Sequence, residues 1–243
     1  MLLIKALTVR SGEKTILDSL NLRFLPYKIH VVIGPGGSGK TTLCVLIKKI
    51  LFDYYISLNS IISEEELNDP SISTLYVKGK VKSSFSSIIY MEQKFKLNNF
   101  SLFHNLFLLG QIPEDSLKKI WSDKYLEVFD ILKLNFNLPI KKLPKYIERL
   151  AYLTLVLSLN PNLLILDEPE VNTDIYMNYM SEKLLEEKNN RTIICITHNI
   201  SFAKEIADNI ILLRYGRVIH KSNVENFWNS KNEFVQSVIK MGC

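Results

Sequence analysis

The sequence predicts an α/β fold whose core is a mostly parallel sheet, and three short apolar runs are the basis of this prediction. The run His30–Ile33 ends in glycines and is followed by a segment with helical character from Lys40 to Leu51. The runs Leu163–Leu166 and Thr192–Ile196 are almost entirely apolar, and polar residues follow each of them. Strands buried on both faces have this composition, and parallel neighbours need a crossover, usually a helix, between them.

Two antiparallel hairpins are expected at the ends of the chain. Residues 2–10 and 15–24 alternate apolar and polar side chains around the turn sequence Ser11–Lys14, which is typical of a hairpin. Residues 210–213 and 217–220 flank a Tyr-Gly pair and predict a second hairpin near the C-terminus.

A helical subdomain is expected within the α/β core. From residue 93 to residue 147 the pattern changes to a helical one that includes several aromatic residues. We therefore predict a single domain over residues 1–243, with residues 1–92 and 148–243 as the α/β core and 93–147 as the inserted helical subdomain. Residues 58–80 are polar, with an acidic run near their start, and are predicted to be a loop or a short-helix insertion.

The composition is that of a globular chain large enough for one α/β domain, with 47% hydrophobic and 23% charged residues among 243. A formal charge of +5 is compatible with nucleic acid or an anionic membrane surface as a partner. We interpret it as lysines spread over solvated faces and expect no nucleic-acid partner. The cysteines are far apart and match no metal spacing, so we expect reduced thiols in a cytosolic protein. They are Cys44, Cys195 and Cys243.

Neither a signal peptide nor a membrane span is expected. Met1–Ile4 is followed by Lys5 too soon for the apolar region of a signal peptide. The longest apolar stretch, Leu150–Leu166, is interrupted by Asn160–Asn162. This interruption predicts a buried helix, a turn and a buried strand rather than a transmembrane helix.

A phosphate-binding loop is predicted between the first core strand and the helix that follows it. Residues 34–41 fit the pattern G-x-x-x-x-G-K-[ST] in this strand–loop–helix context. The glycines let backbone N–H groups face the phosphates, Lys40 reaches the β- and γ-phosphates, and Thr41 Oγ can bind Mg²⁺. The pattern alone indicates a nucleoside triphosphate. The residues of this segment are Gly34, Pro35, Gly36, Gly37, Ser38, Gly39, Lys40, Thr41 and Thr42.

Polar residues that follow two other core strands supply the rest of a phosphoryl-transfer site. Asp167 and Glu168 end the apolar run from Leu163. Asp167 can hold Mg²⁺ directly or through water, and Glu168 can polarise the attacking water. His198 follows the next strand run, so we expect it at the same edge of the sheet, where it can contact the γ-phosphate or orient the water.

These motifs, in this order, resemble those of the ABC ATPase family over nearly the whole chain. The Walker A motif corresponds to residues 34–41 and the Walker B motif to residues 163–168. Gln93, after the apolar run from Ile88, stands where the family has a glutamine that touches the metal or the attacking water and signals to a membrane partner. Asp174 resembles the aspartate that contacts the opposite subunit, and His198 resembles the switch histidine.

The resemblance implies a specific set of ligands and residue roles. The ligands are ATP and Mg²⁺, with ATP held by residues 34–42. The implied catalytic residues are Glu168, His198 and Gln93, and the implied metal-binding residues are Thr41, Gln93 and Asp167. A small GTPase is disfavoured because no NKxD base-reading motif is present.

The chain departs from the family at two positions. The signature LSGGQ falls on a segment in which only the leucine is kept, although a helix can still begin there after proline. The family also places an aromatic residue for adenine near Ser11, where none is available, so stacking must come from elsewhere or be weak. The degenerate signature segment is Leu143, Pro144, Lys145, Tyr146 and Ile147.

The resemblance implies a head-to-tail dimer in which each ATP lies between one subunit's Walker motifs and the other's signature. We favour a heterodimer with a second ABC cassette that carries LSGGQ. The alternative is a slow homodimer in which Lys145 supplies charge to the phosphate.

The function expected from the resemblance is that of the ATP-hydrolysing subunit of a membrane transporter. It would be cytoplasmic and peripheral on the inner face of the membrane, attached through transmembrane permease subunits. Import is favoured, with phosphate as a guess based on Asn68–Pro70, Val77–Val81 and Thr197–Asn199. The alternatives are a regulatory subunit that binds ATP with little hydrolysis and a soluble ABC ATPase outside transport.

Overall fold

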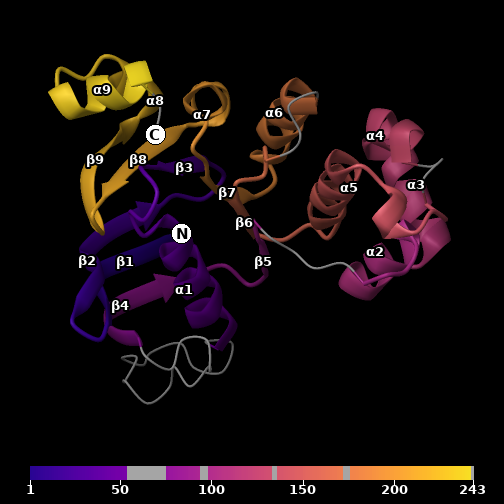
Figure 1. Cartoon of the computed structure of the whole chain (residues 1–243), viewed down its shortest axis with the longest axis horizontal. Helices are drawn as coiled ribbons and strands as arrows, with labels where there is room; N and C mark the ends of the chain where they lie inside the picture. Colours follow the sequence, from indigo (N-terminus) through magenta and orange to yellow (C-terminus); the bar gives the residue numbers. More distant parts are fainter. Residues whose placement is uncertain (54–74, 94–97, 133–135, 172–175, 242–243) are drawn as a thin grey trace.

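The computed structural model describes residues 1–53, 75–93, 98–132, 136–171 and 176–241 (Figure 1). Its centre is a six-stranded sheet with the strand order β5-β6-β7-β3-β8-β9. From β5 to β8 in this order the strands run parallel to one another, and β9 runs antiparallel to β8. The predicted α/β fold with a mostly parallel core is therefore confirmed, as is the C-terminal hairpin. The strands are β3 (Ile29–Ile33), β5 (Ile88–Met91), β6 (Leu163–Asp167), β7 (Thr192–Ile196), β8 (Asn209–Arg214) and β9 (Arg217–Asn223).

A second, antiparallel sheet at the N-terminus has the order β2-β1-β4. Strands β1 (Leu2–Ser11) and β2 (Lys14–Phe24) form the predicted hairpin. Strand β4 (Leu75–Ser83) pairs with β1, so the prediction of a loop or short helix over residues 75–80 is wrong. Val77 and Val81 are buried there. The alternation of these valines with exposed lysines is the pattern of a half-buried strand.

The rest of the expected insertion, residues 58–74, lies outside the described residues, and this includes Asn68–Pro70. Within residues 77–81, which entered the phosphate hypothesis, the chain is strand rather than loop.

The central sheet is the middle of three layers, because its strands bury both faces. Alternate residues of one strand belong to two separate cores: Val31 packs with the cluster on one side and Val32 with the cluster on the other. The side of Val32 is covered by helix α1 (Lys40–Asp53) and the antiparallel sheet. The side of Val31 is covered by helices. They include α5 (Lys145–Ser158), α6 (Met177–Glu187), α7 (Ile200–Ile206), α8 (Val224–Trp228) and α9 (Glu233–Met241).

The predicted helical region lies at the far end of the molecule from the antiparallel sheet, with α5 between it and the central sheet (Figure 1). The fully buried Trp121 is at its centre and donates its Nε1–H to Ser158 Oγ of α5 at 2.9 Å. Helix α5 runs without a break across the expected boundary at residue 147. The other helices are α2 (Leu102–Gly110), α3 (Glu114–Lys124), α4 (Leu126–Leu132) and the 3₁₀ helix η4 (Ile140–Lys142).

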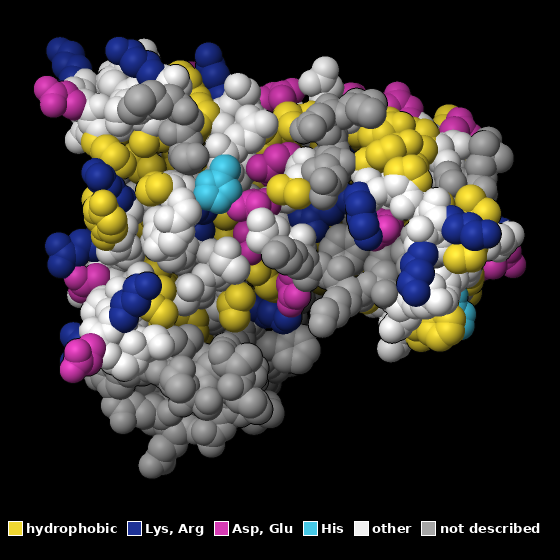
Figure 2. All heavy atoms as spheres, viewed as in Figure 1, with side chains coloured by type: hydrophobic (Ala, Val, Ile, Leu, Met, Phe, Trp, Pro, Cys, Tyr) yellow, Lys and Arg dark blue, Asp and Glu magenta, His cyan; other side chains and the backbone are white. Residues whose placement is uncertain are grey.

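Charged side chains lie on the drawn surface, and the two described cysteines lie in the core. On the face drawn in Figure 2, Lys and Arg side chains are scattered over the described surface and do not gather into one patch. Cys44 and Cys195 are buried free thiols, and burial raises the pKa of each well above its usual value. Cys243 lies outside the described residues. Among the described residues, no helix is both long and apolar enough to cross a membrane.

Candidate functional site

The site lies at the edge of the central sheet where the parallel strands end. Asp167 at the end of β6 is in register with Ile196 at the end of β7, and Ile196 is in register with Val32 of β3. Parallel strands place their carboxyl ends at one edge, so residues that follow them come together although they are far apart in the sequence.

The phosphate-binding loop connects β3 to α1 at this edge. At Gly34, a Cβ atom would lie 2.1 Å from the carbonyl oxygen of Leu213. At Gly39, φ is +98° and a Cβ atom would lie 2.5 Å from a methyl group of Leu17. Only glycine fits these two positions, because its lack of a side chain permits both the close approach and the positive φ.

Helix α1 begins directly after the loop, so its first N–H groups lack intrahelical partners and its N-terminus favours anions. The Lys40 ammonium folds back over the loop and donates to Gly34 O at 2.7 Å and Pro35 O at 3.1 Å. This arrangement provides a phosphate cradle with a cation at its centre.

The Asp167 carboxyl group is 1% exposed, and its two oxygens have different environments. Tyr90 donates its hydroxyl to Oδ2 at 3.0 Å. Oδ1 is buried and accepts no hydrogen bond from the described part of the chain. Burial raises the pKa of Asp167 above its usual value, while the hydroxyl groups of Tyr90 and Thr41 lower it.

These groups fit a Mg²⁺ ion, which prefers oxygen ligands and is commonly held by one or two carboxylates together with substrate phosphates. The buried Oδ1 of Asp167 is an acceptor that a cation would satisfy, and the Thr41 hydroxyl is close enough to lower the pKa of this carboxyl group.

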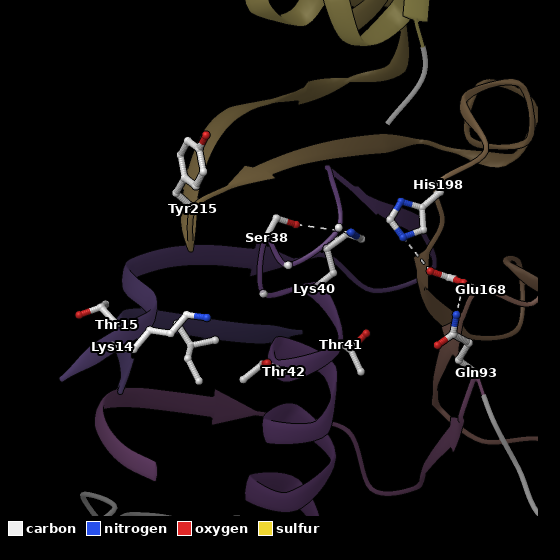
Figure 3. A pocket seen from close by; sticks show the side chains of 14 residues that line it. Lys14, Thr15, Ser38, Lys40, Thr41, Thr42, Gln93, Glu168, His198 and Tyr215 are labelled. Carbon is white, nitrogen blue, oxygen red and sulfur yellow. Dashed lines mark hydrogen bonds and ion pairs between the residues drawn. The ribbon is translucent and has the colours of Figure 1, made fainter. Parts of the chain in front are cut away.

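Glu168, His198 and Gln93 form a connected group beside the phosphate loop (Figure 3). His198 Nε2 lies 2.8 Å from Glu168 Oε1, and the Gln93 amide donates to Glu168 Oε2. The backbone of Glu168 is in the left-handed region with φ +49°, and its N–H donates to Ile196 O at 2.9 Å. Non-glycine residues in this conformation are uncommon and cluster at functional sites.

The residues around His198 fix the chain on both sides of it. Thr197 is fully buried, and its hydroxyl donates to the Glu170 carboxylate. The side chain of Asn199 accepts from Phe202 N at 2.9 Å and so caps α7. With both neighbours held, His198 is directed toward Glu168.

A cavity of about 560 Å³ is lined by residues 36–42 of the phosphate loop and the start of α1, by Gln93, Glu168 and His198, and by four residues that the sequence did not single out as site residues. Figure 3 shows Gln93, Glu168 and His198 on one side of the phosphate loop and Lys14 and Thr15 on the other. The cavity is lined by Lys14, Thr15, Ile16, Gly36, Gly37, Ser38, Gly39, Lys40, Thr41, Thr42, Gln93, Glu168, His198 and Tyr215.

Tyr215 is the aromatic residue among these lining residues. It lies in the β8–β9 turn, is 78% exposed, and has the Arg214 guanidinium 4.9 Å from its ring. The turn reaches the site because Gly216 N donates to Ser38 O at 3.2 Å. This is a long-range contact that no local sequence pattern indicates.

The degenerate signature segment lies outside the cavity, at the start of α5. Leu143 and Ile147 are buried, whereas Pro144 and Lys145 are exposed. Helix α5 begins at Lys145 directly after Pro144, as the sequence predicted. Lys145 Nζ lies 2.9 Å from Glu148 Oε1, and the Tyr146 ring lies 5.7 Å from that of Tyr176. The other expected dimer-contact residue, Asp174, lies outside the described residues.

A glycine-rich loop at a helix N-terminus, with carboxylates at the end of a neighbouring parallel strand, defines a P-loop nucleoside triphosphatase. The sequence profile of the ABC transporter family matches residues 17–171, which is more than half of the chain. The chain therefore belongs to the ABC transporter family, as an ATP-binding subunit and an ATPase.

Relatives and a solved structure agree with this assignment. The chain is 28% identical to the phosphate import ATP-binding protein PstB 1 of Ligilactobacillus salivarius, over 97% of this chain and 87% of that protein. It is 25% identical to the glutamine transport ATP-binding protein GlnQ of Geobacillus stearothermophilus, over 91% and 90% of the two chains. The structure of MJ1267, an ATP-binding cassette of an ABC transporter, has the same fold, with a TM-score of 0.70, 18% identity and 95% of each chain covered.

Proposed function

We propose that this chain binds ATP with Mg²⁺ in the cavity beside the phosphate loop and hydrolyses it to drive a membrane permease. The observation that carries the proposal is the position of Glu168, between His198 and Gln93 at the wall of the cavity that contains Lys40. Phosphoryl transfer needs a positioned water and stabilised charge rather than covalent chemistry from the protein, and this group supplies both requirements.

Each residue then has a separate role. The loop N–H groups and Lys40 hold the phosphates. Thr41 and Asp167 are the Mg²⁺ ligands, and Gln93 reaches the metal or the water. Mg²⁺, when bound, neutralises charge on the β- and γ-phosphates. Glu168 accepts hydrogen bonds from Gln93 and His198 and orients the attacking water, while His198 can also contact the γ-phosphate.

A heterodimer with a second cassette is the assembly that we propose. Pro144 has no N–H, and Tyr146 adds bulk where the family has small residues. Lys145 is held by Glu148, so the start of α5 presents a different chemistry from the family signature. A partner with an intact signature would complete the site built on Lys40 and Glu168.

An importer is the proposed machine, with phosphate as the proposed cargo. Relatives named for the import of phosphate, xylose and sulfate or thiosulfate support import as the direction. Phosphate has the support of the PstB proteins among these relatives. The chain would then act at the inner face of the membrane, attached through permease subunits. Its permease and binding-protein partners would select the cargo.

A regulatory subunit that binds ATP with little hydrolysis is the second candidate, and the chemistry of Leu143–Ile147 favours it. Steady-state ATP hydrolysis by the chain, alone and with co-purified partners, separates the two candidates. The first predicts turnover that a partner cassette restores and that Glu168→Gln abolishes. Tight binding with no turnover beside any partner would establish the regulatory subunit instead. Brisk turnover by the chain alone would favour a homodimer.

A further inference from the structure

Arg149 is a buried arginine that donates hydrogen bonds to backbone carbonyls of the catalytic segments. It lies on α5 and is 4% exposed. Nη1 donates to Glu92 O at 2.8 Å and Gln93 O at 3.2 Å. Nη2 donates to Asp167 O at 2.8 Å and Glu168 O at 2.7 Å, and Nε donates to Pro169 O at 3.3 Å.

These acceptors belong to two separate segments that leave neighbouring strands. Residues 92–93 follow β5, and residues 167–169 end β6 and continue beyond it. Backbone carbonyls beyond the end of a sheet lose their ladder partners and need other donors when they are buried. The guanidinium supplies five N–H donors in a planar fork and can therefore bridge both segments at once.

The contact to Glu168 has a specific consequence. Its backbone is in the left-handed conformation, which persists only where the surroundings hold it. The N–H of Glu168 is held by Ile196 O and its carbonyl by Arg149. The direction of the Glu168 side chain, and with it the contacts to Gln93 and His198, depends on both bonds.

Arg149 also connects these segments to the part of the chain that departs from the family. It lies four residues, about one helical turn, after Lys145, the first residue of α5. A helix moves as a rigid element over such a short distance, so a displacement of its first turn is passed to the guanidinium.

We propose that Arg149 is a positioning residue for ATP hydrolysis, which ties the backbone of Gln93 and Glu168 to the first turns of α5. Movement of α5 then moves both side chains together relative to Lys40. This inference rests on the proposed function, because it assigns Arg149 to the chemistry of Glu168.

Arg191, which follows α6 in the chain, provides a matched control because it contacts the opposite end of α5. It is 3% exposed and donates to Leu157 O at 2.9 Å and to Asn160 Oδ1 at 2.9 Å. It is therefore an equally buried arginine that contacts α5 at a point outside the cavity. A conservative change at either position removes donors but keeps the charge, because lysine has three donors on one nitrogen.

The experiment compares Arg149→Lys with Arg191→Lys in the full chain with its partner subunits. We expect Arg149→Lys to lower kcat about 10- to 100-fold, because small misplacements of catalytic groups have effects of this size. The Kd for MgATP should change less than about threefold, since the carbonyls to which Arg149 donates belong to residues 92–93 and 167–169 and not to the phosphate loop. Arg191→Lys should leave kcat within about threefold at a temperature where both variants are folded.

Hydrogen–deuterium exchange of the same variants provides a readout that does not need turnover. Arg149→Lys should speed exchange in peptides that cover residues 90–93 and 166–171 more than Arg191→Lys does. Equal loss of kcat in both variants, unchanged kcat in Arg149→Lys, or equal exchange in these peptides would overturn the positioning role. If the wild-type assembly showed no turnover, the proposed function would be overturned instead. The exchange comparison would then decide the role of Arg149.

Discussion

Tyr90→Phe tests the electrostatics of the metal site, because it removes one atom from the partner of a buried carboxylate. The Tyr90 hydroxyl donates to Asp167 Oδ2 at 3.0 Å, and the other oxygen of Asp167 accepts no hydrogen bond from the described residues. Burial raises the pKa of Tyr90 above its usual value, so the phenol remains a donor throughout the neutral range. In the variant, the phenyl ring still fills the space, but Asp167 loses this donor.

The magnitude follows from the kind of bond that is lost. A hydrogen bond to a charged group contributes about 1.5–3 kcal/mol. For a chain of this size, 1 kcal/mol corresponds to about 2–4 °C in Tm, so the variant should melt about 3–12 °C lower. The bond favours the ionised form of Asp167, and its loss raises the pKa of this carboxyl group further.

The sign of the pH dependence is fixed by this shift. The folded-state pKa of Asp167 is already raised, so Asp167 makes the fold less stable as pH rises through that pKa. Tyr90→Phe increases this penalty, so the loss of stability should be larger at pH 8 than at pH 5, because the donor stabilises the ionised carboxylate, whose population rises with pH. A further prediction is weaker MgATP binding, because a higher pKa of Asp167 increases the competition between protons and the metal for this carboxylate.

Thermal melts at the two pH values and MgATP titration measure both effects. Tyr125→Phe is the control, because Tyr125 donates to Glu187 Oε1 at 3.0 Å far from the cavity. It should lower Tm and leave MgATP binding unchanged. An equal loss of Tm at pH 5 and pH 8 for Tyr90→Phe would show that the hydrogen bond does not favour the ionised form of Asp167, and equal MgATP affinity would remove the phenol from the metal site.

Substitutions at three further residues test their individual roles in the cavity. Glu168→Gln should lower kcat about 10²- to 10⁴-fold in a steady-state assay while MgATP still binds, because only water activation is lost; unchanged turnover would remove the glutamate from this role. Lys40→Ala should weaken MgATP binding about tenfold or more in a titration, since a charged hydrogen-bond donor to phosphate is lost; an unchanged Kd would contradict the phosphate cradle. Tyr215→Ala should weaken ATP binding about 5- to 100-fold if the ring stacks on the base, because such stacking contributes about 1–3 kcal/mol. Tyr215→Phe should bind as the wild type does, and equal loss of affinity for inorganic triphosphate would exclude base stacking.

The core of the fold was predictable because its strands are buried on both faces. Runs such as Leu163–Leu166 and Thr192–Ile196 have few other interpretations once polar residues follow them. The same reasoning predicts that Asp167, Glu168 and His198 meet at one edge, because parallel strands share their carboxyl ends. For these residues the local sequence pattern was sufficient, because it predicts the parallel strands, and the parallel arrangement determines which side chains meet.

Other features depend on contacts that the local pattern does not contain. Strand β4 has an alternating pattern, but glycine interrupts it, and its partner β1 lies about seventy residues earlier. Tyr215 enters the cavity only because the β8–β9 turn lies against Ser38. Arg149 lies in α5, where most of the residues around it in the sequence are apolar and buried. A buried charge at such a position requires partners. That signal indicates that Arg149 has partners, but it does not say which carbonyls they are.

The position of Arg149 bears on the meaning of the altered signature segment. Helix α5 begins at Lys145, directly after Pro144, and also carries Arg149. The altered signature segment and the arginine that supports Glu168 therefore lie on the same helix. In a heterodimer, the site built on Lys40 would receive its signature from the partner but its Glu168 support from this chain's own Arg149. A change at Lys145 and a change at Arg149 should then affect different sites of the pair. Arg149→Lys should slow the site that contains Glu168 of this chain, whereas Lys145→Ala should mainly alter the site formed with the partner's Walker motifs.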